Sequence, residues 1–131
     1  TLDDFCNAIK TYEGFGAPGA VINGIDYPDG TPSWRNNNPG NCRYSPVGYL
    51  PKYGNVQKTA DDFAIFPTYD LGWLYLQNLI KAKVELNPNY SILSFMENYA
   101  PVSDGNDPVK YAQFIATQLK VPLTYAMNNF V

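Results

Sequence analysis

Carboxylates and carboxamides are the side chains that could do chemistry here, because the chain contains no histidine. The absence of histidine excludes Ser-His-Asp and Cys-His catalysis and any histidine-ligated metal. Acid–base chemistry is therefore left to carboxylates, Lys, Tyr or Cys. Glu85 lies among lysines at the end of an expected helix, and Glu97 lies off an apolar stripe. Glu13 is thus the only glutamate that the sequence pattern directs toward a core.

Glu13 comes at the end of a predicted helix over residues 2–13, with Thr1 as its cap and Gly14 as its stop. The helix has an apolar stripe at helical spacing, formed by Leu2, Phe5, Cys6 and Ile9. One further turn of that stripe reaches Glu13. Desolvation and the helix C-terminus both favour the neutral carboxyl, which is the form that a general acid needs. The alternative is a glutamate turned outward at a frayed helix end.

The segment Trp34–Tyr44 concentrates hydrogen-bonding groups in a stretch that cannot be the interior of a helix. Pro39 lacks an amide proton, Gly40 permits positive φ, and Asn favours turns. The segment carries four carboxamides and two guanidinium groups: Asn36, Asn37, Asn38, Asn41, Arg35 and Arg43. This set suits a ligand with many hydroxyl and amide groups, such as an acetylated sugar. The alternative is a loop whose Asn side chains satisfy its own backbone.

Cleavage of a glycoside requires a protonated carboxyl and then either a second carboxylate or help from the substrate. The candidates for a second carboxylate lie in expected loops: Asp26, Asp29, Asp104 and Asp107. The first two belong to residues 14–33, which contain five Gly and three Pro and which we expect to form a loop. The Asp-Gly pair after Pro28 is also typical of an ordinary turn.

The remaining elements predict an α+β fold with a small antiparallel sheet. Three short strands are expected at Asn41–Tyr44, Asn55–Lys58 and Phe63–Phe66, and Gly48–Lys58 should contain a turn around Pro51–Gly54. Helices are expected from Thr68 to about Leu86, from Ser91 to about Asn98, from Asp107-Pro108, and from Pro122 to about Asn128.

Composition indicates one globular domain over residues 1–131. Hydrophobic residues make up 45% of the chain, which argues against disorder, and the net charge of −3 argues against nucleic acid as a partner. No apolar run reaches membrane length, so we expect no membrane insertion. We expect no cofactor and no metal. Cys6 and Cys42 could form a disulfide or be two small buried residues.

Four blocks of the sequence together resemble a known family. They are Tyr12-Glu13-Gly14-Phe15, the run from Arg35 to Tyr44 with its Asn-Asn-Pro-Gly-Asn core, the run from Phe63 to Trp73, and Tyr99-Ala100-Pro101. In this order they resemble the lysozyme-like, transglycosylase-type muralytic domains of phage virion proteins, endolysins and bacterial wall enzymes. The resemblance covers residues 1 to about 120.

The resemblance implies a lysozyme-like α+β fold that is mostly helical, with a small antiparallel sheet and a substrate cleft between lobes. It implies cleavage of the β-1,4 bond from N-acetylmuramic acid to N-acetylglucosamine in the glycan strand of peptidoglycan. The enzyme would be a lytic transglycosylase or a lysozyme, extracellular and associated with the cell wall or a phage virion. The sequence leaves the oligomeric state open.

Carried over residue by residue, the resemblance makes Glu13 the catalytic acid at the end of the first helix. The candidates for substrate contacts are Asn38, Asn41, Arg43, Tyr44 and Tyr99. Cys42 stands where the family would have an aliphatic residue. It is either a core substitution or a disulfide partner for Cys6.

Two outcomes of cleavage stay open at this point. Without a second carboxylate in reach, the muramic acid 6-hydroxyl would attack and give a 1,6-anhydro product. With Asp26 or Asp29 across the cleft, water would attack as in a lysozyme. Two other functions also stay open: a non-catalytic glycan-binding or virion structural module, and a chitinase-like hydrolase.

Overall fold

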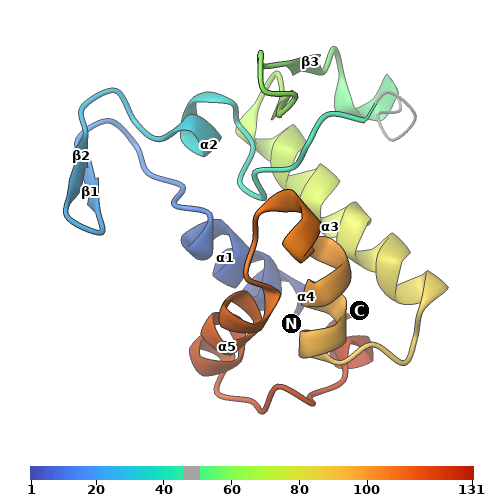
Figure 1. Ribbon diagram of the computed structural model, residues 1–131. Helices are drawn as coiled ribbons and strands as arrows, with labels where there is room; N and C mark the ends of the chain where they lie inside the picture. Colours follow the sequence, from blue (N-terminus) through green and yellow to red (C-terminus); the bar gives the residue numbers. More distant parts are fainter. Residues whose placement is uncertain (46–50) are drawn as a thin grey trace. The chain divides into compact units, whose positions relative to one another are not determined.

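The computed structural model describes residues 1–45 and 51–131. The described chain is an α+β fold, about half helical, with two small antiparallel sheets of two strands each (Figure 1). Its elements, in chain order, are α1 (Leu2–Tyr12), β1 (Ala20–Ile22), β2 (Ile25–Tyr27), α2 (Pro32–Arg35), the 3-10 helix η2 (Pro51–Tyr53), β3 (Gln57–Lys58), β4 (Ala64–Ile65), α3 (Tyr69–Leu86), α4 (Ile92–Tyr99), η3 (Val102–Asp104), α5 (Pro108–Leu119) and η4 (Met127–Phe130).

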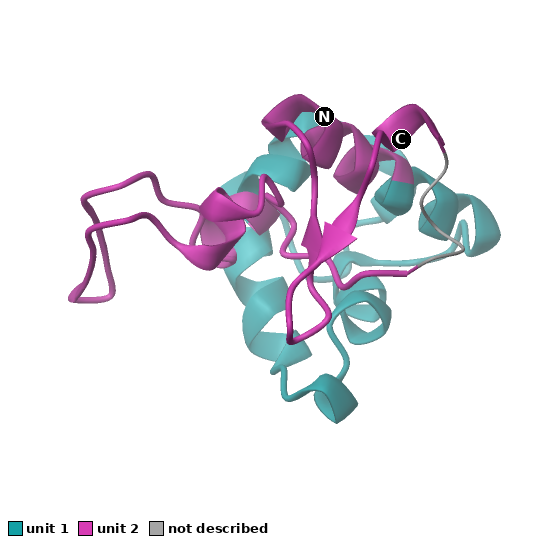
Figure 2. Cartoon of the chain, turned by 90° about the horizontal axis from the view of Figure 1, so that it is seen from above, with its two compact units in different colours: residues 1–8, 79–131 teal, residues 9–78 magenta. Residues whose placement is uncertain are grey.

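The chain divides into two compact units (Figure 2). One comprises residues 1–8 and 79–131, and the other comprises residues 9–78. The boundaries fall inside α1 and α3. The expectation of one domain over residues 1–131 stays a prediction.

The unit of residues 1–8 and 79–131 has an aromatic core. Phe5 makes an edge-to-face contact with Phe95, with ring centroids 5.6 Å apart, and its centroid is 5.2 Å from that of Phe130. The same unit contains further side chains that are fully buried: Ile92, Met96, Ala112, Ile115 and Met127. α4 and α5 pack against each other and contribute their apolar sides to this core, and α1 and η4 contribute the remaining side chains.

Capping residues set the starts of three helices where the sequence predicted them. The Thr68 hydroxyl accepts a hydrogen bond from the Leu71 amide at 3.2 Å, at the start of α3. Ser91 and Ser94 form a reciprocal capping box before α4. Asp107 accepts from the Lys110 amide at 3.1 Å, with Pro108 as the first residue of α5. These three predictions are confirmed.

The predicted helix from Pro122 to Asn128 is wrong. The Ile92 amide donates to the Tyr125 carbonyl at 3.0 Å, and the Met127 amide donates to the Tyr90 carbonyl at 2.9 Å. These bonds hold Tyr125 to Met127 against the start of α4 as a bridge, so their backbone groups are not free for a helix. Only the short η4 (Met127–Phe130) forms, beyond that bridge.

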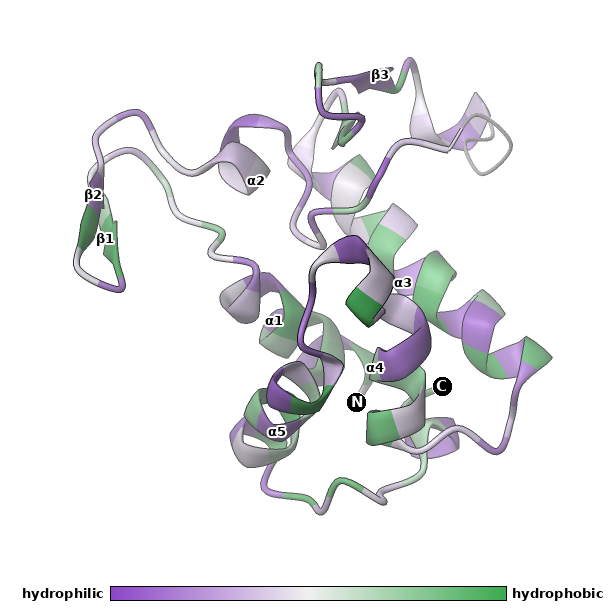
Figure 3. Cartoon of the chain, in the orientation of Figure 1, coloured by the Kyte–Doolittle hydropathy of each residue, from purple (hydrophilic) through white to green (hydrophobic). Residues whose placement is uncertain are grey.

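The stretch 14–33 was predicted to be a loop and instead contains a β-hairpin and α2. Asn23 and Gly24 both have positive φ, 51° and 77°, as a two-residue hairpin turn requires. The hairpin projects from the rest of its unit in Figures 1 and 2, and Figure 3 shows hydrophobic residues on both of its strands. Two of them are well exposed, Val21 at 64% and Ile25 at 54%. The Asn-Gly pair flanked by β-branched residues was the signal for this hairpin.

The predicted small antiparallel sheet is present around β3 and β4, although its strands are short. Gln57 pairs with Ile65, and Lys58 pairs with Ala64. The third expected strand, Asn41–Tyr44, is reduced to a single bridge between Arg43 and Phe63. The turn expected at Pro51–Gly54 is formed by η2 and by Gly54 at φ 76°. Residues 48–50 of that predicted region lie outside the described residues.

Gly72 allows α3 to touch the backbone of the Asn-rich segment. A Cβ atom at Gly72 would lie 1.8 Å from the carbonyl oxygen of Asn37. No side chain fits in that space, so the contact depends on glycine.

We expect Gly72→Ala to destabilise the fold by about 1–3 kcal/mol, because the added methyl must push the Asn37 backbone away from α3. At other positions in a helix, Gly→Ala would stabilise the protein by about 1 kcal/mol. The sign of the stability change therefore shows whether the close contact at Gly72 exists. Urea unfolding measures the difference. Lys81→Ala, at an exposed position of α3, is the control and should change stability by no more than about 0.5 kcal/mol. A Gly72→Ala protein as stable as the control would contradict the close contact.

Candidate functional site

Glu13 is held at the capped end of α1. The Gly14 amide donates to the Thr11 carbonyl at 3.1 Å, and the Phe15 amide donates to the Lys10 carbonyl at 3.2 Å. With Gly14 at φ 72°, these two bonds form a Schellman motif. Glu13 is the last residue before the left-handed glycine, and its amide still bonds to the Ile9 carbonyl at 2.9 Å. The prediction of a helix ending at Glu13 with Gly14 as its stop is therefore confirmed to within one residue.

A cation–aromatic cluster fixes the same end of α1. The Lys10 ammonium lies 4.8 Å from the ring centroid of Phe15, 4.9 Å from that of Tyr69 and 5.9 Å from that of Trp73. It also donates a hydrogen bond to the Tyr69 hydroxyl at 3.0 Å. Tyr69 and Trp73 are stacked on one face of α3. The cluster thereby ties the last turn of α1 to the first turn of α3.

Glu13 differs in burial from every other acidic residue of the chain. All twelve Asp and Glu residues lie in the described part, and eleven of them are exposed. Glu13 is partly buried. Its Oε1 accepts a hydrogen bond from the Asn41 side-chain amide at 3.4 Å, a long contact. The predicted acid and one carboxamide of the Asn-rich segment are thus brought together.

Asn41 reaches Glu13 from a turn that only a few residue types tolerate. Its φ is 46°, in the left-handed region, which Asn adopts more readily than most other residues. Its amide donates to the Asn38 carbonyl at 2.9 Å and closes the turn through Pro39 and Gly40. The side chain of Asn41 stays partly exposed, so its predicted contact with a substrate remains a prediction that this placement permits.

Asn38 was predicted to contact the substrate, and that prediction is wrong for the structure described. Its side chain is only 1% exposed. The side-chain amide donates to the carbonyl oxygens of Cys42 at 2.9 Å and Ala64 at 3.0 Å, while Oδ1 accepts from the Cys42 amide at 2.9 Å. All three bonds are internal, so Asn38 fastens the segment to β4 and has no group left for a ligand.

Two further Asn residues bind the same segment to the end of β4. The Phe66 amide donates to the Asn36 carbonyl at 2.9 Å, and the Asn37 side chain donates to the Phe66 carbonyl at 3.0 Å. The Asn-rich segment is therefore mostly a scaffold, which is the alternative that the sequence left open. Asn41 is the carboxamide that it directs to Glu13.

Asp26 and Asp29 are poorly placed to be a second carboxylate. Asp26 pairs across the hairpin with Val21, on the face opposite to Ile22. Ile22 is the side chain that approaches Gly14, next to Glu13, so Asp26 is on the face directed away from it. Asp29 is exposed in the turn closed by the Gly30 amide and the Tyr27 carbonyl at 3.1 Å. The ordinary turn foreseen after Pro28 is what the structure contains.

Arg43 and Tyr44 follow the Asn-rich segment at the edge of β4. The Arg43 guanidinium lies 4.9 Å from the centroid of Phe63 and is exposed. The Tyr44 backbone amide donates to the Asp62 carbonyl at 2.8 Å, and its ring is partly exposed. Their predicted contacts with a substrate stay predictions.

Tyr99 ends α4 in the unit of residues 1–8 and 79–131. Its ring stacks on Phe95 with centroids 5.7 Å apart and meets Tyr111 edge to face at 6.4 Å. These contacts tie the ring to the core of that unit, and the residue is partly exposed. The predicted role of Tyr99 in substrate binding stays a prediction.

Cys6 and Cys42 are both buried thiols. Cys6 is completely buried, and Cys42 is 8% exposed. Of the two alternatives, the structure therefore contains the small buried core residues and not the disulfide.

Sequence reasoning missed Lys10, Tyr69 and Trp73, which position the end of α1. The spacing of Tyr69 and Trp73, four residues apart, indicates a shared helix face. Nothing in the sequence indicates that Lys10, 59 residues away from Tyr69, is their partner.

Other classes of site find no support in residues 1–45 and 51–131. No group of three or more Asp, Glu or Cys residues in these ranges is arranged to hold a metal ion. No helix there has both the length and the apolar character needed to cross a membrane. No protein-family model, curated protein or solved structure matches the chain.

We expect Asn38→Ala to destabilise the protein by about 3 kcal/mol, because buried backbone groups of Cys42 and Ala64 lose their partner. Guanidinium or urea unfolding measures the loss. Asn36→Ala is the matched control: Asn36 bonds to Phe66 through its backbone carbonyl, which alanine keeps, so stability should change by no more than about 0.5 kcal/mol. Equal effects at the two positions would refute the structural role of the Asn38 side chain.

Proposed function

We propose that this chain is a lysozyme-like glycosidase that cleaves peptidoglycan, with Glu13 as its general acid and base. One observation carries the proposal: Glu13 is the one residue among the twelve Asp and Glu that is partly buried, and it lies beside a carboxamide donor at a capped helix end. A carboxyl that must give up and regain a proton benefits from such partial desolvation and fixed geometry. The resemblance of the four sequence blocks supplies the substrate, the glycan strand of a cell wall.

In the proposed reaction, the Glu13 carboxyl donates its proton to the oxygen that leaves N-acetylmuramic acid. The bond from that oxygen to the muramic C1 breaks through an oxocarbenium-like transition state. Asn41 would hold the Glu13 carboxyl in position through its contact with Oε1. Once it is ionised, Glu13 is the base for the second step.

The placement of Asp26 and Asp29 favours help from the substrate over a second carboxylate. The muramic 6-hydroxyl would attack C1, its proton would pass to Glu13, and a 1,6-anhydro end would form. The proposed activity is therefore that of a lytic transglycosylase, acting at the cell wall, outside the cell or on a phage virion. A lysozyme outcome would need an attacking water activated by a group other than these two exposed aspartates.

Glu13→Gln should fold normally and lose activity on purified peptidoglycan by at least about 100-fold, because the amide cannot donate the required proton. Turbidity clearing and release of soluble fragments measure the activity, and circular dichroism checks the fold. Asp29→Asn is the matched control and should keep nearly full activity. Full activity in Glu13→Gln would refute the assignment of Glu13 as the general acid. If the wild-type protein binds cell walls but releases no fragments, it is a glycan-binding module and not an enzyme.

The products of digestion should carry 1,6-anhydro-muramic ends. Mass spectrometry distinguishes them from the reducing ends of hydrolysis, which are heavier by one water. Reducing ends alone would contradict the transglycosylase outcome while leaving Glu13 as the acid. Asp26→Asn should not change the product distribution.

A further inference from the structure

The turn of the β1–β2 hairpin contains the one Asn-Gly pair of the chain, Asn23-Gly24. An asparagine side chain can cyclise onto the backbone nitrogen of the residue that follows it. Glycine hinders that attack least, because it has no Cβ atom. Among the asparagines of the chain, Asn23 therefore has the least hindered neighbour. The reaction also requires that the side chain and the amide nitrogen are accessible and not held by hydrogen bonds.

Both reacting groups of the pair are accessible in the structure. Asn23 and Gly24 are exposed, and a Cβ atom built on Gly24 would meet no other part of the described chain within 4 Å. Within residues 1–45 and 51–131, neither the Asn23 side chain nor the Gly24 amide makes a hydrogen bond. The turn is closed by the flanking pair, Ile22 and Ile25. The Gly24 nitrogen is therefore free to act as the nucleophile.

The hairpin also permits the conformational change that cyclisation needs. Its two strands pair only with each other, over three residue pairs. A two-stranded hairpin is marginally stable by itself, so its turn opens more easily than the packed elements of the chain.

Two Asp-Gly pairs, Asp29-Gly30 and Asp104-Gly105, have the same spacing but a bonded nitrogen. Aspartate can cyclise in the same way, with loss of water. The Gly30 amide, however, donates to the Tyr27 carbonyl at 3.1 Å, and the Gly105 amide donates to the Val102 carbonyl at 2.9 Å. Each bond must break before the nitrogen can lose its proton and attack. The structure therefore distinguishes the Asn23-Gly24 pair from these two.

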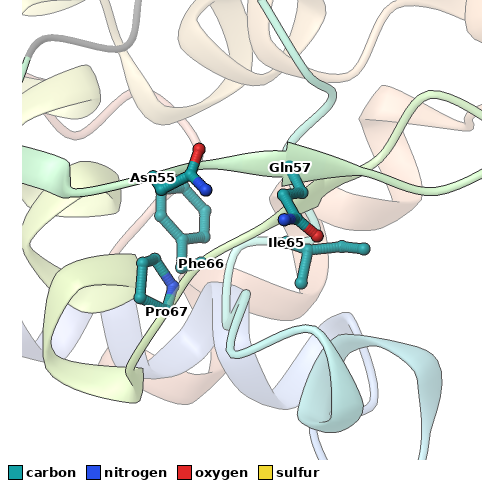
Figure 4. Close-up of a pocket in the computed structure, with 5 residues that line it drawn as sticks. All are labelled: Asn55, Gln57, Ile65, Phe66 and Pro67. Carbon is teal, nitrogen blue, oxygen red and sulfur yellow. The ribbon is translucent and has the colours of Figure 1, made fainter.

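Asn55 is the matched comparison within the chain. It is exposed and lies in a tight turn beside a small pocket that it lines with Gln57, Ile65, Phe66 and Pro67 (Figure 4). The residue that follows it is Val56, which is β-branched and crowds its own amide nitrogen. The Val56 amide also donates to the Gly54 carbonyl at 3.1 Å. Asn55 thus shares the exposure of Asn23 without its free, unhindered neighbour.

We propose that Asn23 is a site of spontaneous deamidation, a covalent modification that consumes water and needs no enzyme. The Gly24 nitrogen loses its proton to solvent and attacks Cγ of Asn23. The bond from Cγ to Nδ2 breaks, and Nδ2 takes a proton from water and leaves as ammonia, so a five-membered succinimide remains. Water then adds to one of the two ring carbonyls, and the bond from that carbon to the ring nitrogen breaks. The nitrogen regains a proton, and no group is oxidised or reduced.

One of the two products changes the backbone of the hairpin turn. Opening at Cγ gives aspartate, whereas opening at the main-chain carbonyl gives isoaspartate, in which the chain runs through Cβ and Cγ of residue 23. The turn is then one backbone atom longer and no longer fits the register of Ile22 with Ile25. Ile22 is also the hairpin side chain that approaches Gly14 and Gly16. The loss of register therefore extends to the residue that follows Glu13.

Incubation of the intact, folded protein at mildly alkaline pH tests the site. Peptide mapping by mass spectrometry, after digestion at low pH, measures the exchange of the amide NH2 for OH at each asparagine. Asn23 should be modified at least about tenfold faster than Asn55, a difference of about 1.4 kcal/mol in barrier. The rate at Asn23 should rise about tenfold for each pH unit, because the deprotonated fraction of the Gly24 amide does.

Asn23→Gln keeps a carboxamide but would have to form a larger ring, so residue 23 should then stay unmodified. Modification of Asn55 at an equal or higher rate would overturn the proposal. Modification of Asn23 in urea but not in the folded protein would also overturn it, because the native turn would then protect the pair. The outcome does not depend on the proposed function.

The structural consequence is tested on the separated isoaspartyl form with Asn23→Asp as its control. Both carry the new charge, but only isoaspartate lengthens the backbone, and Asp tolerates the left-handed conformation of residue 23. NMR should show the cross-strand contact of Val21 with Asp26 in Asn23→Asp and not in the isoaspartyl form. The same contact in both forms would refute the opening of the hairpin.

Discussion

The unit of residues 9–78 depends on the burial of one neutral side chain, the carboxamide of Asn38. Two of its hydrogen bonds satisfy the Cys42 amide and the Ala64 carbonyl, and the third goes to the Cys42 carbonyl, which also accepts from the Ala64 amide. A charged residue could not make both kinds of bond in that place, and an apolar one could make none. The turn that carries Asn41 comes directly after Asn38 in the chain. The buried Asn38 side chain therefore fixes the position from which Asn41 contacts Glu13.

Much of the helical part of the fold could be predicted from the sequence because its signals are local. Gly14 after Glu13, Ser91 before α4 and Asp107-Pro108 before α5 act on the backbone groups next to them, and the structure uses each as expected. The hairpin at Asn23-Gly24 had an equally local signal that the density of Gly and Pro around it obscured. The last predicted helix failed because the Tyr125 carbonyl and the Met127 amide bond to Ile92 and Tyr90, which are far away in the sequence.

The candidate site was harder to predict because tertiary contacts, and not local sequence, determine the role of each of its residues. Asn36, Asn37, Asn38 and Asn41 are the same residue type within six positions, yet one is buried, two are tied to Phe66 and one contacts Glu13. No periodicity distinguishes them, because which carboxamide faces β4 depends on the partner strand. The same holds for Lys10, because two of its three aromatic neighbours, Tyr69 and Trp73, come from the distant helix α3, and only Phe15 is close in sequence.

The two buried thiols have a practical consequence. Cys6 belongs to the unit of residues 1–8 and 79–131, and Cys42 belongs to the unit of residues 9–78. A buried thiol reacts with an alkylating reagent only when its surroundings open. The rate at which each cysteine is alkylated therefore reports the local opening of its own unit. The chain therefore contains one natural probe of local opening in each of its two units, and no label has to be added.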